Sequence, residues 1–213
     1  MLRLYDNRLS GNGYKPRLLL AHLGRRYERV ELDILKGETR TPDFLALNPN
    51  GRIPLLALDD GICIAESNAI LFYLAEGTPF LPGDSIARAL TLQWMFFEQY
   101  SHEPNIAVVR HWIQHVEMTE AQRAQLPARQ EAGHAALAVM QRHLDGSDWF
   151  GGGAASIADF ALYAYTHVAR EGGFDLDPYP AIGAWLARVA DIPGHVAMNP
   201  APEGIVEPGA EAG

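Results

Sequence analysis

The sequence changes character at a short segment rich in glycine and proline, GTPFLPGD, at residues 77–84. Before it, short runs that alternate apolar and polar residues are interspersed with short helical patterns, which predicts a mixed α/β region. After it, strand signals disappear and long amphipathic helical patterns follow. Two prolines and two glycines interrupt any element that runs through them. We therefore expect an α/β domain over 1–77, a linker at 78–83 and an all-helical domain over 84–200.

The chain ends with APEGIVEPGAEAG, residues 201–213. Glycine, proline, alanine and glutamate dominate this segment, and such a composition buries too little apolar surface to order a chain. The sequence therefore predicts a disordered tail.

Charge and hydropathy limit the functional classes. The 213 residues carry 17 lysines and arginines against 26 acidic residues, a net charge of −9, which argues against a broad nucleic-acid-binding surface. No apolar stretch approaches the roughly 20 residues that a membrane helix needs. The first residues, MLRLYD, turn polar too soon for a signal peptide. We expect a cytoplasmic protein with no nucleic-acid or membrane partner.

Cys63 is the single cysteine of the chain. One thiol forms neither an intrachain disulfide nor a Cys-x-x-Cys pair nor a thiolate metal cage. The eight histidines show no metal-ligand spacing with acidic partners. We therefore expect no metal cofactor.

Residues 48–70, NPNGRIPLLALDDGICIAESNAI, predict a turn, a strand over 54–58, a hairpin turn and a second strand over 62–65. Pro54 opens the first strand, where a residue without an N–H group is tolerated, and the Ile53-Pro54 bond is a candidate cis peptide. A cis bond there would turn the backbone N–H and C=O of Ile53 out of the sheet. An extended peptide-like ligand can pair with such groups as a strand does.

A helix is predicted to begin near Glu66, with Ser67 beside it. The unpaired N–H groups and the dipole of a helix start favour a carboxylate, whereas Glu66 favours an ammonium. The two together suit an α-amino acid headgroup. The alternative is simple capping, in which Ser67 bonds a backbone N–H and Glu66 complements the dipole. On this stretch alone, capping is the favoured account.

The clearest helix start of the chain lies in GGGAASIADFALYAYTHVA, residues 151–169. Ser156 can cap the amide of Asp159 while the Asp159 side chain returns to the cap residue. Apolar residues at helical spacing follow, which predicts a central helix of the second domain.

Together these features resemble the glutathione transferase family, over residues 1 to about 200. Three short motifs carry the resemblance: the Arg52-Ile53-Pro54 turn, the Glu66-Ser67 pair and the Ser156-x-x-Asp159 box. The resemblance implies a thioredoxin-like α/β N-terminal domain that binds glutathione, followed by an all-α C-terminal domain. It places the cysteinyl backbone of glutathione on Ile53 and the γ-glutamyl headgroup on Glu66 and Ser67. For that pair, the resemblance favours ligand binding over capping.

The family keeps its catalytic loop between the first strand and the first helix, where this chain reads YDNRLSGNGYKPRLLL. A free thiol with a pKa of about 8.5 is mostly protonated at neutral pH, so donors aimed at sulfur raise the reactive thiolate fraction. The loop resembles that of bacterial members with Ser-Gly-Asn-Gly, which implies Ser10 as catalytic donor, Asn12 as a second donor and added positive potential from Lys15. Read alone, it is also a tight helix-capping loop.

The resemblance implies further contacts. Many members use a tyrosine near the end of the first strand, so Tyr5 and Tyr14 are alternative donors, although Tyr5 is expected inside the strand. Lys36 and Arg52 occupy places where the family binds the glycine end of glutathione, and the alternative for each is a solvated surface charge. Tyr100 and Arg110 are the candidates for the second-substrate site. The alternative for Tyr100 and Trp112 is a core position.

The implied activity is that of a glutathione transferase, which directs the thiolate at a small hydrophobic electrophile by conjugation or peroxide reduction. Two alternatives stay open. One is a glutathione-dependent disulfide reductase, in which a second glutathione replaces the missing resolving cysteine. The other is a non-catalytic glutathione-binding module. The family also implies a twofold homodimer that uses the helices beginning at Glu66 and Asp84.

Overall fold

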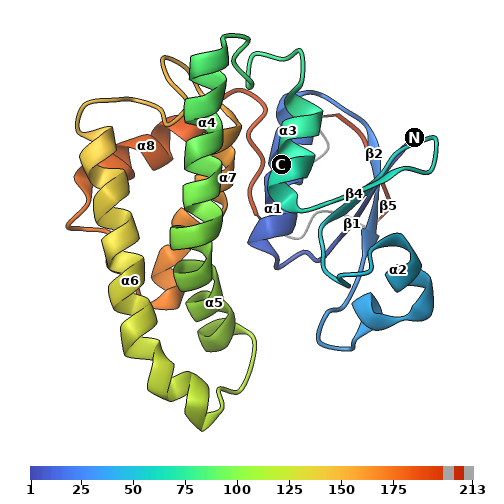
Figure 1. Ribbon diagram of the computed structural model, residues 1–213, viewed down its shortest axis with the longest axis horizontal. Coiled ribbons are helices and arrows are strands. Elements are labelled where there is room, and N and C mark those ends of the chain that lie inside the picture. Colours follow the sequence, from blue (N-terminus) through green and yellow to red (C-terminus); the bar gives the residue numbers. More distant parts are fainter. Residues whose placement is uncertain (199–203, 209–213) are drawn as a thin grey trace. The chain divides into compact units, whose positions relative to one another are not determined.

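The computed structural model describes residues 1–198 and 204–208. The chain divides into two compact units (Figure 1). The sheet unit consists of Met1–Glu76 and the chain from Ile192 onward, and the helical unit is Gly77–Asp191. The second unit therefore ends before residue 200, the expected boundary. Residues after Asp191 pack on the first helix of the sheet unit, where His22 Nδ1 lies 3.0 Å from the Pro193 carbonyl oxygen.

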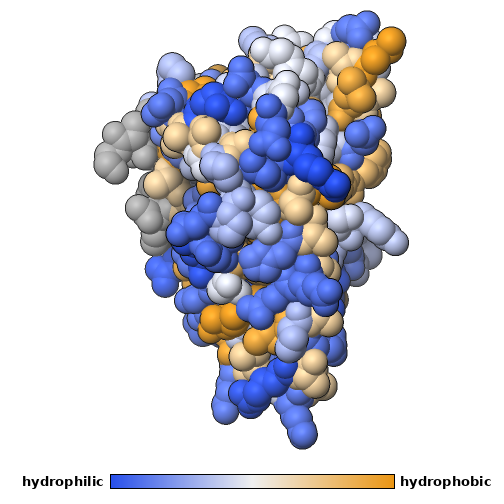
Figure 2. All heavy atoms as spheres, turned by 90° about the vertical axis from the view of Figure 1, so that its left-hand side faces the viewer, coloured by the Kyte–Doolittle hydropathy of each residue, from blue (hydrophilic) through white to orange (hydrophobic). Residues whose placement is uncertain are grey.

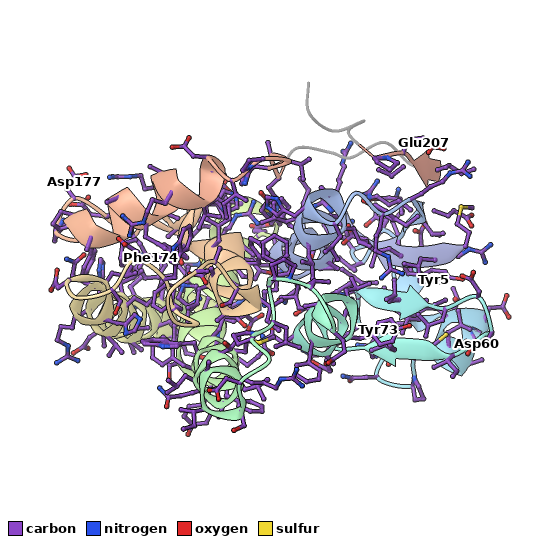
Figure 3. All side chains as sticks on the ribbon, turned by 90° about the horizontal axis from the view of Figure 1, so that it is seen from above. Tyr5, Asp60, Tyr73, Phe174, Asp177 and Glu207 are labelled. Atoms are coloured by element: carbon purple, nitrogen blue, oxygen red, sulfur yellow. The ribbon has the colours of Figure 1, made fainter. Side chains whose placement is uncertain are left out.

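The sheet unit contains a mixed sheet of five strands in the order β4-β3-β1-β2-β5. β1 (Leu2–Asp6) pairs in parallel with β2 (Tyr27–Glu31) and antiparallel with β3 (Leu55–Ala57), and β3 pairs antiparallel with β4 (Cys63–Ala65). The two hairpin strands are shorter than the expected 54–58 and 62–65, since Pro54, Leu58 and Ile62 lie outside the paired register. Asp60 marks the tip of this hairpin (Figure 3).

The chain end differs from the expected disordered tail. Gly204–Val206 form β5, which pairs antiparallel with the outer edge of β2. Val206 is buried, and Glu207 (labelled in Figure 3) lies 2.6 Å from Arg26 Nε. Two adjacent apolar residues at 205 and 206 are enough to extend the sheet by one short strand where an edge is available. Residues 201–203 and 209–213 lie outside the described residues.

Helices cover both faces of this sheet. α1 (Gly11–His22) and α3 (Ser67–Ala75) lie side by side on one face, and the short α2 (Pro42–Leu47), preceded by the 3-10 turn η1 (Glu38–Arg40), lies on the other (Figure 1). Between α1, α3 and the sheet is a core of fully buried leucines and isoleucine: Leu4, Leu18, Leu19, Leu56, Ile70 and Leu71. This packing holds the starts of α1 and α3 beside each other.

The helical unit contains α4 (Ser85–Phe97), α5 (Glu103–Gln114), α6 (Glu120–Leu144), α7 (Ile157–Thr166) and α8 (Pro180–Ala190), with a 3-10 turn η3 (Ala169–Gly172) (Figure 1). A π-helical segment, η2 (Glu98–His102), joins α4 to α5. Pro104 lies in the first turn of α5. Proline lacks an N–H group and clashes with the carbonyl four residues earlier, which accounts for the break at this point.

α7 is the central helix of its unit, and each of its ten residues is buried. The predicted capping box is present: Ser156 Oγ accepts from the backbone of α7, and the Asp159 carboxylate accepts from Ser156 N at 2.8 Å. Asp159 also accepts from Phe150 N and from Trp185 Nε1, each at 3.0 Å. Burial raises the pKa of this carboxyl group, and the donors oppose the shift.

The face of the molecule that carries α6 is largely hydrophilic, with apolar side chains scattered over it (Figure 2). This is the polar outer surface of an amphipathic helix. Over the described ranges, 1–198 and 204–208, no helix combines the length and the apolar character that crossing a membrane requires.

Candidate functional site

Ser10 lies at the N-cap of α1, directly after the loop that leaves β1. Its Oγ accepts from Gly13 N at 3.1 Å, and its backbone N–H donates to Asn7 O at 2.9 Å. The capping role is therefore observed. A hydroxyl that accepts a hydrogen bond still carries its own proton. Ser10 can therefore cap α1 and donate to a ligand at the helix start at the same time.

The loop before Ser10 is tied to the end of β2. Asn7 Nδ2 donates to Leu32 O at 3.0 Å, and Asn7 Oδ1 accepts from Leu9 N at 3.1 Å. The backbone N–H of Arg8 donates to both carboxylate oxygens of Glu31, at 3.0 and 3.1 Å. These bonds fix the backbone on which Ser10 is carried.

Beneath the loop lies a buried ionic cluster. The Asp6 carboxylate is 2.9 Å from Arg17 Nε and 3.6 Å from Arg29 Nε, and the three side chains are at most 2% exposed. Arg29 also pairs with Glu31. Burial raises the pKa of Asp6 to about 6, and the two guanidinium groups oppose that shift. A Cβ atom at Gly13 would overlap Asp6 Oδ1, so glycine is required where α1 crosses this carboxylate.

The start of α3 faces the start of α1. Glu66 is the N-cap residue of α3 but makes no side-chain capping bond, and its φ of +68° is the left-handed conformation that non-glycine residues rarely adopt. Ser67 is buried, and its Oγ accepts from Lys15 Nζ at 3.3 Å and donates to Asn12 Oδ1 at 3.3 Å. The hydroxyl is therefore directed at α1, and simple capping by Ser67 is not the arrangement found.

The Ile53-Pro54 bond is cis, as predicted. Its turn is held by the buried Asn48 side chain, which donates from Nδ2 to Arg52 O at 2.7 Å and accepts from Asn50 N at 3.1 Å. Ile53 precedes Leu55, the first residue of β3 in the paired register. The backbone of Ile53 thus lies outside the ladder, as the proposed pairing with a peptide-like ligand requires.

The two basic residues differ in their surroundings. Lys36 is 76% exposed, and its Nζ lies 3.1 Å from the Asp33 carboxylate, a bond that raises the pKa of the lysine. Arg52 is exposed on the turn that presents Ile53. The structure thus brings Arg52 next to the cis-proline turn and places Lys36 in an exposed pair after β2.

The alternative tyrosine donors are engaged elsewhere. Tyr14 is fully buried, and its hydroxyl donates to Val196 O in the returning chain. Tyr5 lies inside β1, with its ring edge-on to Phe44 at a centroid distance of 5.8 Å (Figure 3). In the loop itself, Ser10 and Asn12 are the side-chain donors near the helix start.

In the helical unit, Arg110 on α5 is only 7% exposed, and its Nε lies 2.6 Å from the Glu171 carboxylate. Its charge therefore has a partner inside the unit, which accounts for Arg110 without a substrate. Tyr100 lies in η2 and is 87% exposed, so the alternative core position for it is wrong. Trp112 is a core residue.

Within the described part of the chain, no group of three or more His, Cys, Asp and Glu side chains is placed to hold a metal ion. Cys63 is half-buried on β4, with Sγ 3.8 Å from Gly61 O. This thiol lies on a strand and not in the loop that carries Ser10.

Residues 1–76 match the family model of the glutathione S-transferase N-terminal domain, and residues 121–188 match that of the C-terminal domain. The chain is 33% identical over 192 residues to the disulfide-bond oxidoreductase YfcG of Escherichia coli (strain K12), which covers 85% of this chain and 87% of that protein. The chain belongs to the glutathione S-transferase family. Glutathione transferase activity follows from that membership.

Comparison with solved structures supports the same family assignment. The transferase is similar to a glutathione S-transferase from Pseudomonas fluorescens [Pf-5] at a TM-score of 0.90 and 51% identity, covering 92% of this chain and 98% of that one. It is also similar to Ure2p in complex with glutathione, at a TM-score of 0.81 and 25% identity, covering 91% and 90%. The predicted fold, a thioredoxin-like domain followed by an all-helical domain, is confirmed.

Sequence reasoning missed the Asp6 cluster and the burial of Lys15. A signal for the first was present, because Leu2, Leu4 and Asp6 share one face of a strand whose leucines are apolar. A carboxylate on that face needs buried cationic partners. No local pattern, in contrast, distinguishes a buried Lys15 from an exposed one.

Proposed function

We propose that this transferase binds glutathione across the adjacent starts of α1 and α3 and holds the cysteinyl sulfur as a thiolate with the Ser10 hydroxyl and the Asn12 side chain. One observation carries the proposal: the Ser67 hydroxyl contacts both Lys15 and Asn12, at 3.3 Å each. The residue expected to bind the headgroup and the residue expected to contact the sulfur thus belong to one polar cluster. A single tripeptide can reach both.

The other glutathione contacts follow from the same placement. The backbone of Ile53, before cis-Pro54, pairs with the cysteinyl residue, and Glu66 binds the α-ammonium group. Arg52 binds the glycine carboxylate of glutathione. Lys36 binds the same carboxylate after leaving its exposed ion pair with Asp33, which contributes little to stability.

Tyr100 is proposed to contact the second substrate. The Tyr100 ring lies on η2 and is largely exposed. An exposed aromatic ring offers apolar surface on which a hydrophobic electrophile can pack. Arg110 was predicted for the same site, and its ion pair with Glu171 makes it the weaker candidate.

The thiolate supports two outcomes with small electrophiles. In conjugation, sulfur forms a bond to carbon and the leaving group departs with its electron pair. In peroxide reduction, sulfur attacks one peroxide oxygen, the O–O bond breaks, and a sulfenic acid and an alcohol form. A second glutathione then condenses with the sulfenic acid to give glutathione disulfide and water.

A second candidate function is disulfide reduction, which the similarity to a disulfide-bond oxidoreductase favours. One glutathione thiolate attacks the substrate disulfide and releases one thiolate, and a second glutathione attacks the mixed disulfide and releases the other. The two glutathiones become glutathione disulfide. No protein cysteine takes part, which suits a chain whose one cysteine lies on β4.

The test is turnover by the purified protein with an aryl halide, an alkyl hydroperoxide and a small mixed disulfide. Conjugation consumes glutathione without forming glutathione disulfide, whereas the other two reactions form it. Calorimetric binding of glutathione with no turnover on any substrate would assign the protein to the non-catalytic binding modules. A reducing compartment such as the cytoplasm, where glutathione stays a thiol, is the expected location.

We predict that Ser67→Ala weakens glutathione binding. The variant removes a charge-assisted hydrogen bond of about 1.5 to 3 kcal/mol, which is roughly ten- to a hundredfold in Kd. Calorimetry measures it. The matched control is Ser85→Ala, because Ser85 is likewise the first residue of a helix but is exposed on α4. Equal Kd values for the Ser67→Ala and wild-type proteins would exclude the headgroup contact.

We further predict a homodimer. α4 exposes the large apolar side chains of Ile86 (70%) and Phe96 (70%), and Tyr73 on α3 (labelled in Figure 3) is 44% exposed. Large apolar side chains left exposed on each of these helices suit the twofold contact that the family resemblance implies. Sedimentation at micromolar concentration should give about twice the chain mass of 23.4 kDa. Ile86→Asp should shift the population toward monomer. A wild-type protein that sediments only as the monomer contradicts the prediction.

A further inference from the structure

Lys15 is fully buried on the first turns of α1, although an ammonium group is costly to remove from water. Its Nζ lies 3.3 Å from Ser67 Oγ, which in turn lies 3.3 Å from Asn12 Oδ1. The proposed function uses Ser67 and Asn12 directly. From Lys15, the proposed function needs only a positive potential near the sulfur. An exposed lysine would supply that potential as well.

The chemistry of the three groups fixes the direction of the two bonds. An ammonium has only donors, so Ser67 Oγ accepts from Lys15. The single proton of Ser67 therefore points away from Lys15 and donates to Asn12 Oδ1. An asparagine whose oxygen is turned toward Ser67 has its two Nδ2 donors at the opposite end of the amide.

We propose that Lys15 is a positioning residue, which makes the Ser67 hydroxyl a donor and thereby orients Asn12 with its Nδ2 group toward the glutathione sulfur. The inference rests on the proposed function. A headgroup carboxylate can share the same Ser67 proton in a three-centre bond. Because the first donor in the chain is charged, each following bond is polarised and strengthened. Lys15 thus acts on both the headgroup and the sulfur without contacting either.

The experiment measures two quantities, the glutathione Kd by calorimetry and the pKa of the bound thiol by ultraviolet thiolate absorbance. Lys15→Met keeps an unbranched apolar side chain, one atom shorter, and removes the ammonium donors. It should weaken binding about tenfold and move the thiolate titration upward by about one pH unit. Arg123→Met, which removes an exposed cation from α6, should change neither quantity.

A double-mutant cycle separates the relay from simple attraction at a distance. If Lys15 acts through Ser67, Lys15→Met has little effect in the Ser67→Ala background. If the ammonium acts through space, Lys15→Met shifts the thiolate titration equally in both backgrounds, and that result overturns the proposal. The other charged groups near these helix starts, Glu66 and the Asp6–Arg17 pair, are the same in every variant.

A second cycle needs no change at Lys15 and so covers the case in which Lys15→Met fails to fold. Ser67→Ala should raise the pKa of the bound thiol in the wild-type background and leave it unchanged in the Asn12→Ala background. A Ser67→Ala shift of equal size in both backgrounds overturns the relay. A wild-type protein with no glutathione binding and no thiolate absorbance would instead overturn the proposed function, so the two failures are distinguishable.

Discussion

Ser10→Ala is expected to lower turnover near neutral pH by about a hundredfold, which is the usual loss when one preorganised donor to a developing or full negative charge is removed. Ser10 caps α1 through its Oγ, which accepts from Gly13 N, so its own proton is the one left for the sulfur. Without that donor, the thiolate is less favoured relative to the thiol. The ultraviolet titration of bound glutathione should therefore move to higher pH.

Glutathione affinity should change little in Ser10→Ala, because the headgroup contacts at Glu66 and Ser67 are intact. A loss in kcat with a nearly constant Kd is the signature of an interaction with the reacting atom. The variant also loses a helix cap, which costs about 1 kcal/mol of stability. Thr41→Ala controls for this loss, because Thr41 caps α2 by accepting from Phe44 N at 3.3 Å.

Asn12→Ala decides between the two donors in the loop. If Asn12→Ala abolishes the thiolate absorbance and Ser10→Ala does not, Asn12 is the catalytic donor and the assignment to Ser10 is wrong. If both variants move the titration, the sulfur receives two donors, and the larger shift identifies the main one.

Asp6→Ala is expected to lower the free energy of unfolding by about 3 to 5 kcal/mol, because removing one partner of a buried ion pair leaves the other charge uncompensated. The Arg17 side chain, which is fully buried, would lose a carboxylate at 2.9 Å, and Arg29 one at 3.6 Å. Urea unfolding followed by far-ultraviolet circular dichroism measures the change. The expected loss is a large fraction of the stability of an ordinary domain.

The matched control for Asp6→Ala is Asp33→Ala. Asp33 also pairs with a cation, but that partner, Lys36, is 76% exposed, and exposed pairs are worth at most about 1 kcal/mol. Equal unfolding midpoints for Asp6→Ala and Asp33→Ala would show that the buried cluster does not stabilise the sheet unit.

Local signals were enough to predict most of the fold. The cis-proline turn, the β3–β4 hairpin and the Ser156–Asp159 capping box each depend on residues within a few positions of one another. The strand β5 was missed because its three residues are ordered only by pairing with β2, far earlier in the chain.

The site was predictable only in part, because contacts between residues far apart in the chain leave no local signal in the sequence. Ser10, Asn12, Ser67 and the turn at Ile53 belong to motifs that can be read locally. The partner of each side chain cannot be read in that way. Asp6 meets arginines from α1 and from β2, and the Ser67 hydroxyl turns toward α1 instead of its own helix. These contacts are set by packing among separate elements, which periodicity does not encode.

The return of the chain to the sheet unit has a consequence for synthesis. The ribosome makes residues 1–76 first and then the whole helical unit before Ile192 emerges. Until Gly204–Val206 have been made, β2 is an open sheet edge, a template for wrong pairing with other chains. The Tyr14 hydroxyl also gains its acceptor, the Val196 carbonyl oxygen, only from this late segment. Most of the sheet unit is therefore translated before the helical unit, but the sheet unit is completed only after it.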